Sequence, residues 1–183
     1  MYGELVMLIL SQLVLPIVLM LVAASALIIG HELAHVLTGL AVGFRIESIE
    51  LGRGRSIVSF RTAGVLVTST LLPLDGYVRF RSVPFSSSSI RHSLVQAAGP
   101  VFHLCVGTIP VVLIGVSRLF TDTSRSVTGW RVFVLWNVML CLVSAVPHSY
   151  RIDGEIRHSD GRQLIRALQA FYSTRLLDSS DHT

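Results

Sequence analysis

Three long stretches of the chain are apolar and almost free of charge. The first begins with residues 5–30, which contain no charged side chain, and it continues to Phe44. It is too short for two transmembrane helices and a turn, because each helix needs about 20 residues to cross a bilayer. We therefore predict one long helix whose membrane-embedded part covers about residues 10–42. The two other stretches predict spans over about residues 94–119 and 127–147.

The segment between the first two spans has a different pattern. Residues 45–81 combine β-branched and aromatic residues with turn-forming glycines. The apolar runs are Ile57-Val58-Ser59-Phe60 and Val65-Leu66-Val67, and the glycines are Gly52, Gly54, Gly64 and Gly76. Such runs, separated by glycine, are typical of short strands. We expect a small sheet or hairpin at the membrane surface.

The segment after the third span divides into two parts. Residues 148–159 are polar and have no regular period, so we predict an irregular loop there. From about residue 161 to 177, apolar residues recur at helical spacing, with arginines among them. The apolar residues are Leu164, Ile165, Leu168, Phe171, Tyr172 and Leu176. This pattern predicts an amphipathic helix. Its apolar face has two candidate partners, the membrane surface and the β-element.

The composition favours a membrane protein and argues against a nucleic-acid partner. Hydrophobic residues make up 51% of the 183 residues, and the mean hydropathy is +0.66. The net charge is +4, and all fifteen basic residues are arginines. No basic stripe interleaved with aromatic residues is present in the sequence. We therefore predict a mainly α-helical integral membrane protein surrounded by the lipid bilayer.

The distribution of arginine predicts the orientation of the chain. Seven arginines lie between the first and second spans, and five follow the third span. Only three lie in or beside the loop between the second and third spans. Because arginine-rich loops face the cytoplasm, we expect a multi-pass protein of the cell membrane with its N-terminus outside and its C-terminus inside.

The first apolar stretch ends in a motif that points to metal chemistry, His31-Glu32-Leu33-Ala34-His35. On a helix the two histidines lie on one face, so their imidazole nitrogens can bind one zinc ion. Glu32 follows the first histidine directly, so its carboxylate can accept a proton from a water whose pKa zinc lowers to about 7. The alternative is that these polar side chains form hydrogen bonds between membrane helices.

Two histidines leave a catalytic zinc ion one protein ligand short, because such ions usually have three. Asp160 is the preferred candidate, since Ser159-Asp160-Gly161 stands at the start of the predicted amphipathic helix and ordered backbone would hold it. Asp153 is the second candidate. A role for Asp160 in capping the helix, without binding metal, is the remaining alternative.

Several motifs together resemble the site-2 protease family of intramembrane zinc metalloproteases. The resemblance covers about residues 25–168, and the motifs occur in the family's order. Besides the histidine motif, the similar segments are Gly43-Phe44-Arg45-Ile46-Glu47-Ser48, Pro73-Leu74-Asp75-Gly76-Tyr77-Val78, Gln96-Ala97-Ala98-Gly99-Pro100, and Pro147 followed by Ser159-Asp160-Gly161. The resemblance implies that His31, His35 and Asp160 bind Zn²⁺, and that Glu32 is the catalytic residue.

The chain departs from the family's pattern at three positions. Asp75 stands where the family usually has glycine, His103 stands where the second core helix has asparagine, and Ser144 replaces an asparagine before Pro147. These departures concern the positioning of substrate more than metal binding. His103 is a candidate contact to the substrate, to the oxyanion or to the metal itself, and a hydrogen bond between helices is the alternative.

The resemblance also implies an architecture and a function. We expect a three-helix transmembrane metalloprotease core, a surface β-element and an amphipathic helix in a single domain over residues 1–183, without a PDZ-like or nucleotide-sensing domain. The implied function is a zinc endopeptidase that hydrolyses peptide bonds in or near transmembrane segments of membrane-protein substrates. The alternatives are a membrane-bound zinc peptidase acting on soluble or exported peptides, and a non-catalytic membrane adaptor that retains the metal site.

Overall fold

The protein is mainly helical, and three of its helices are long and apolar enough to cross a membrane. The computed structural model describes residues 3–4, 7, 10–81, 89–152 and 154–180. Within these residues, the three candidate spans are Leu10–Ala41, Ile90–Ile114 and Ser126–Ala145. The predicted helical membrane protein with three candidate spans and small sheets is confirmed at this level.

The first span consists of a short π-helix, η1 (Leu10–Val14), followed without a break by the α-helix α2 (Leu15–Ala41). Helix α2 ends at Ala41, and Gly43 follows with a φ of 87°, in the left-handed region that glycine adopts without strain. The amide of Phe44 donates to the carbonyl oxygen of Gly39 at 2.8 Å, and that of Gly43 donates to Leu40 at 3.0 Å. These two bonds form a Schellman cap, which explains why the helix stops here.

The chain consists of two compact units. One contains Met1–Leu33 and Ile46–Phe80, and the other contains Ala34–Arg45 and Arg81–Thr183. The division falls inside α2, which is one continuous helix. The spacing of residues along α2 is therefore fixed by helical geometry on both sides of the division.

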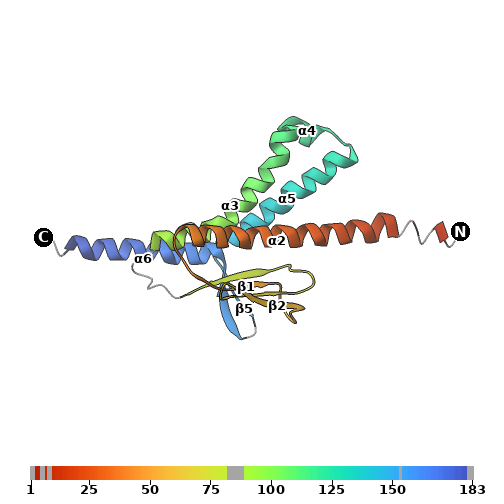
Figure 1. The fold of residues 1–183 in the computed structure, drawn as a ribbon. Coiled ribbons are helices and arrows are strands. Elements are labelled where there is room, and N and C mark those ends of the chain that lie inside the picture. The colour runs from red at the N-terminus through yellow and green to blue at the C-terminus, as the bar shows by residue number, and fades with distance from the viewer. Residues whose placement is uncertain (1–2, 5–6, 8–9, 82–88, 153, 181–183) are drawn as a thin grey trace. The chain divides into compact units, whose positions relative to one another are not determined.

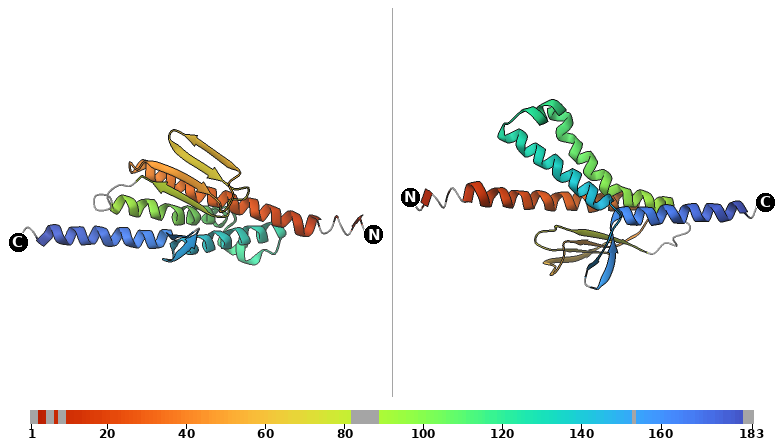
Figure 2. Two further views of the ribbon diagram at one scale, coloured as in Figure 1. Left: turned by 90° about the horizontal axis from the view of Figure 1, so that it is seen from below. Right: turned by 180° about the vertical axis from the view of Figure 1, so that it is seen from behind.

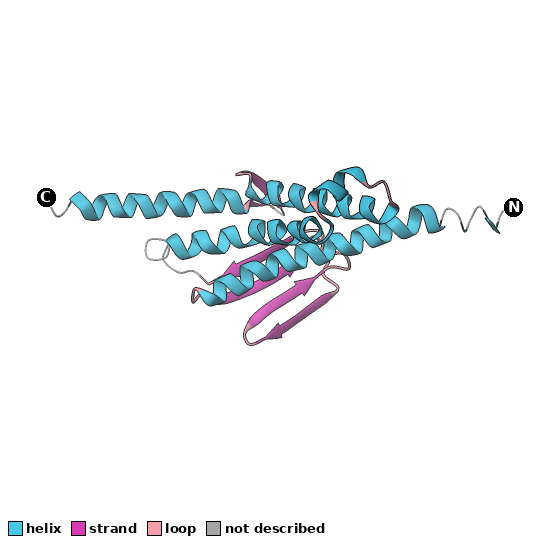
Figure 3. Cartoon of the chain, turned by 90° about the horizontal axis from the view of Figure 1, so that it is seen from above, coloured by secondary structure: helices cyan, strands magenta, loops and turns pink. Residues whose placement is uncertain are grey.

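The first unit contains a four-stranded sheet with the order β2-β3-β1-β4. Its strands are β1 (Ile46–Leu51), β2 (Val58–Thr62), β3 (Val65–Ser69) and β4 (Gly76–Phe80). Figure 3 draws the strands in magenta. Strand β1 runs parallel to β3 and antiparallel to β4. Strands β2 and β3 form a hairpin whose turn residues, Ala63 and Gly64, both have positive φ, as a tight hairpin turn requires.

The second unit contains the helices α3 (Ser89–Ile114), α4 (Val116–Thr121), α5 (Arg125–Ala145) and α6 (Asp160–Ser180). Helix α3 packs against both α5 and α6 (Figures 1 and 2). The most buried side chains of this packing include Val95 and His103 on α3, Asn137 on α5, and Ala167 on α6. The predicted second span, 94–119, is interrupted at Gly115, whose φ of 86° ends α3 and starts the short helix α4.

The segment between α5 and α6 is ordered, so the expectation of an irregular loop over 148–159 is wrong. It forms a hairpin of β5 (Ser149–Ile152) and β6 (Glu155–His158). The pKa of His158 is lowered mainly by burial, and to a smaller extent by the guanidinium groups of Arg166 and Arg162. A neutral His158 can accept a hydrogen bond at Nδ1 from the hydroxyl of Ser149, 2.7 Å away. The predicted helix over 161–177 is present as α6.

Candidate metal centre

Two buried histidines lie on the same face of α2. His31 is 8% exposed and His35 is 5% exposed, and one turn of unbroken helix separates them. Side chains four residues apart on a helix have Cβ atoms about 5–6 Å apart, so two imidazoles can reach a common ion. The helix therefore presents the histidines as a preformed pair.

The carboxylate of Asp160, the first residue of α6, lies beside the second of these histidines. The Nε2 atom of His35 is 3.5 Å from Oδ2 of Asp160. Ligands bound about 2.0–2.2 Å from a tetrahedral zinc ion lie about 3.4 Å from each other, so this separation matches two ligands of one ion. It exceeds the usual length of an N–H···O hydrogen bond, about 2.7–3.2 Å.

The other nitrogen of His35 determines which atom of the ring can bind metal. Nδ1 of His35 lies 2.7 Å from the backbone carbonyl oxygen of Val95 in α3. A carbonyl oxygen can only accept a hydrogen bond, so Nδ1 carries the proton in this pair. In the neutral ring, Nε2 then directs a lone pair toward Asp160. A cation between Nε2 and the carboxylate would stabilise both groups, as in many zinc sites where a histidine donates its second N–H to a backbone carbonyl.

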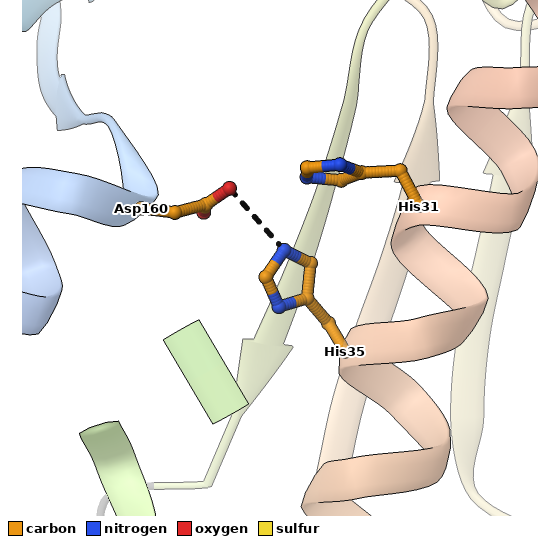
Figure 4. A group of neighbouring side chains, drawn as sticks. All are labelled: His31, His35 and Asp160. Carbon is orange, nitrogen blue, oxygen red and sulfur yellow. Dashed lines mark ion pairs between the residues drawn. The ribbon is translucent and has the colours of Figure 1, made fainter. Parts of the chain in front are cut away.

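The three candidate ligands each offer one atom, and these atoms all lie within 4.8 Å of one another. Figure 4 shows His31 and His35 projecting from successive turns of α2, with the carboxylate of Asp160 facing His35. Two imidazole nitrogens and one carboxylate oxygen are a donor set found in catalytic zinc sites, where the fourth position stays open for water or substrate. The residues thus fit a catalytic zinc ion.

Glu32 is buried beside the first strand residue of β4. Glu32 is only 6% exposed. It lies so close to the backbone of Gly76 that a Cβ atom at position 76 would overlap the Glu32 carboxyl group. Both residues belong to the first unit. Glycine at position 76 therefore allows the strand to approach this carboxylate.

The start of α6 lies equally close to the end of α5. A Cβ at Gly161 would overlap the backbone carbonyl oxygen of Ala145. Gly161 is buried, and it follows Asp160 directly. A glycine at this point therefore lets the helix that carries Asp160 approach α5.

The remaining residues singled out from the sequence are not in the described cluster of His31, His35 and Asp160. His103 is 1% exposed, and its Nδ1 lies 3.3 Å from Oδ1 of Asn137 on α5. Asp75 forms an ion pair with Arg53. Ser144 donates to the carbonyl oxygen of Cys141 within α5. Asp153, the second candidate for third ligand, lies outside the residues that the structure describes.

The sequence indicated some of the contacts of these residues but not others. Asn137 is a polar residue in the middle of an apolar span, and such residues commonly pair between membrane helices. The contact of His35 with Val95 uses a backbone oxygen, which every residue has. No residue type at position 95 could have indicated it.

Comparison with known proteins finds a matching family and several similar proteins. The profile of Peptidase family M50 matches residues 19–175. A protein of Chlamydia pneumoniae is 27% identical over 138 residues, which cover 62% of this chain and 22% of that protein. A protein of Chlamydia trachomatis is 28% identical over a match with the same two coverages, and one of Campylobacter jejuni is 30% identical over 50% of this chain and 28% of its own length.

All three relatives carry provisional names as zinc metalloproteases. The chain spans less than a third of the length of each of them. The cofactor expected from the sequence, zinc, is confirmed by these names together with the cluster of His31, His35 and Asp160. Because the family profile covers most of its length, the chain belongs to Peptidase family M50, the site-2 protease family.

Proposed function

We propose that this protein is an intramembrane zinc endopeptidase that hydrolyses peptide bonds in or near transmembrane segments of other membrane proteins. The observation that carries the proposal is the set of ligand atoms from His31, His35 and Asp160 within 4.8 Å of one another, with Glu32 adjacent to the first ligand. Membership of Peptidase family M50 and the three apolar helices support it.

The chemistry follows from the donor set and from Glu32. Zinc held by His31, His35 and Asp160 would supply a Lewis acid, which would lower the pKa of a bound water to about 7 and polarise a substrate carbonyl. Glu32 is the general base and accepts a proton from the water that attacks the carbonyl carbon. When the C–N bond breaks, Glu32 gives this proton to the leaving nitrogen, and the products are a carboxylic acid and an amine.

The membrane location of the site is part of the proposal. The arginine distribution orients the chain with its N-terminus outside, so the histidine motif lies in the cytoplasmic half of the first span. Hydrolysis consumes water, and polar groups within a membrane face a protein interior or a water-filled cavity. We therefore expect a polar path from the cytoplasm to Glu32.

Two other functions are compatible with the same donor set. A membrane-bound zinc peptidase acting on soluble or exported peptides would use identical chemistry, and only the substrate would differ. A non-catalytic adaptor would keep the metal without needing a general base, and the buried Glu32 beside the first ligand argues against it.

Protein fragments released in cells test these functions against one another. Membrane and secreted proteins would be compared between cells expressing the wild type and cells expressing Glu32→Gln. We expect fragments that end in or near transmembrane segments in the wild-type cells alone. Fragments of soluble or exported proteins alone would support the second function. Identical fragment patterns in the two strains would contradict a protease.

A further inference from the structure

The buried side chain of Ser159 ties the turn before Asp160 to the end of α5. Its Oγ atom donates a hydrogen bond to the carbonyl oxygen of Val146 at 2.8 Å and accepts one from the amide of His148 at 3.0 Å. The amide of Arg162, in the first turn of α6, lies 3.4 Å from the same oxygen. Ser159 is 6% exposed, so solvent competes little for these bonds. One hydroxyl thus links three backbone groups, two just after α5 and one in the first turn of α6.

The backbone of Ser159 strengthens this junction. Its amide donates to the carbonyl oxygen of His148 at 3.1 Å, and its carbonyl oxygen accepts from the amide of Gln163 at 3.0 Å. The hairpin over residues 149–158 therefore begins and ends at one point, with Ser159 closing it. The chain returns to the end of α5 before it continues into Asp160.

Asp160 lies between two residues that are fixed to α5. Ser159 is bonded to Val146, and Gly161 packs against the carbonyl oxygen of Ala145. A metal ligand keeps its geometry only when neighbouring groups restrain it, and loss of such a restraint typically lowers metal affinity by about 10–100-fold. The direction of the Asp160 carboxylate toward His35 therefore depends on these flanking contacts.

We propose that Ser159 is a positioning residue for the third metal ligand, and that its hydroxyl holds Asp160 at the distance from His35 that zinc requires. The proposal rests on the metal site described under Proposed function. The hydroxyl acts through the backbone, and Ser159 itself does not bind the metal. Threonine can make the same three hydrogen bonds, whereas alanine can make none of them.

Metal titration of the purified 183-residue protein tests this role. The apo forms of the wild type, Ser159→Ala, Ser159→Thr and Asp160→Asn would be titrated with Zn²⁺ against a competing chelator, and with Co²⁺, whose visible spectrum reports the arrangement of its ligands. Ser173→Ala is one control, because its hydroxyl donates to the carbonyl oxygen of Gln169 within the same helix, α6. Gln163→Ala is the second, since it removes a different side-chain bond, to His158, at the start of the same helix.

We expect Ser159→Ala to lower zinc affinity by about 10–100-fold and to alter the Co²⁺ spectrum, with Ser159→Thr close to the wild type and both controls unchanged. Wild-type affinity in Ser159→Ala, with affinity lost in Asp160→Asn, would overturn the positioning role and leave the metal site intact. Equal losses in Ser159→Ala and Gln163→Ala would also overturn it, because a general weakening of the helix start would then explain both. Wild-type affinity in Asp160→Asn would instead show that the proposed ligand set is wrong.

Discussion

The backbone carbonyl oxygen of Val95 lies 2.7 Å from Nδ1 of His35, so helix α3 fixes the ring of a histidine on α2. This hydrogen bond sets the tautomer of the ring and leaves Nε2 facing Asp160, 3.5 Å away. The candidate metal centre therefore depends on the packing of α3 as well as on the motif. Its candidate ligands, on α2 and at the start of α6, lie far apart in the sequence.

Removal of a histidine ligand should abolish stoichiometric zinc. In His31→Ala or His35→Ala we expect the bound metal to fall well below one ion per chain, because two protein ligands remain. His92→Ala is the matched control, since the ring of His92 packs at a tilt against Phe44 with centroids 4.6 Å apart and is not among the candidate ligands. Metal analysis of the purified proteins measures this, and full occupancy in His35→Ala would refute the assignment.

Two conservative substitutions distinguish Asp160 from Asp153 as the third metal ligand. Asp160→Asn should weaken zinc binding, because an amide oxygen carries no charge to neutralise the ion. Asp153→Asn should leave zinc binding unchanged. The same metal analysis decides between them, and the reverse pattern would assign the third ligand to Asp153.

Gly161→Ala should disturb the site through packing. The new methyl group would overlap the carbonyl oxygen of Ala145, so α6 must shift away from α5, at a cost of about 1–3 kcal/mol in stability. Zinc affinity should fall as Asp160 moves. In the control Gly129→Ala, the added methyl meets nothing within 4 Å, so zinc affinity should not change. Thermal unfolding and metal titration report the two effects, and an unaltered Gly161→Ala would contradict the close approach.

Gly76→Ala should affect catalysis more than metal binding. Its methyl group would displace the side chain of Glu32, which is not among the candidate ligands. Displacement of a catalytic group by about 1 Å can lower the rate by about 100-fold. We expect loss of cleavage with zinc retained, measured on the same preparation. Cleavage at the wild-type rate would show that strand β4 does not restrain Glu32.

Substitutions of His103 and Asn137 distinguish two roles considered for His103, contact with the substrate and a hydrogen bond between helices. If the pair only joins α3 to α5, His103→Leu should destabilise the protein by about 1–3 kcal/mol, because Oδ1 of Asn137 loses this partner in a buried position. The double variant with Asn137→Leu should recover part of the loss. Cleavage by the folded His103→Leu protein at the wild-type rate would exclude contact with substrate, whereas a large loss with zinc retained would support it.

The sequence indicated much of the fold because apolar runs and short motifs carry local information. The long first span and the strands after it follow from hydropathy and glycine placement. The hairpin over residues 149–158 was missed, because its four-residue strands are too short to show an alternating pattern. The break at Gly115 was also missed, since one glycine in an apolar run rarely ends a helix.

In the candidate site, too, the sequence indicated some features and not others. His31, Glu32 and His35 form a local motif, and Asp160 could be ranked by its place before a helix. The contacts that restrain these residues are long-range: the carbonyl oxygen of Val95 at His35, and the end of α5 at Ser159 and Gly161. Backbone oxygens and the space around a glycine become visible only when the helices are packed.

The most direct test of the central claim is a paired measurement on Glu32→Gln, in which bound zinc and cleavage of a membrane substrate are determined on one preparation. Glutamine keeps the size of the side chain but cannot act as a general base, so we expect zinc at the wild-type level and a loss of cleavage by at least about 100-fold. Cleavage at the wild-type rate with zinc bound would contradict the account, because the proton would then be accepted by another group.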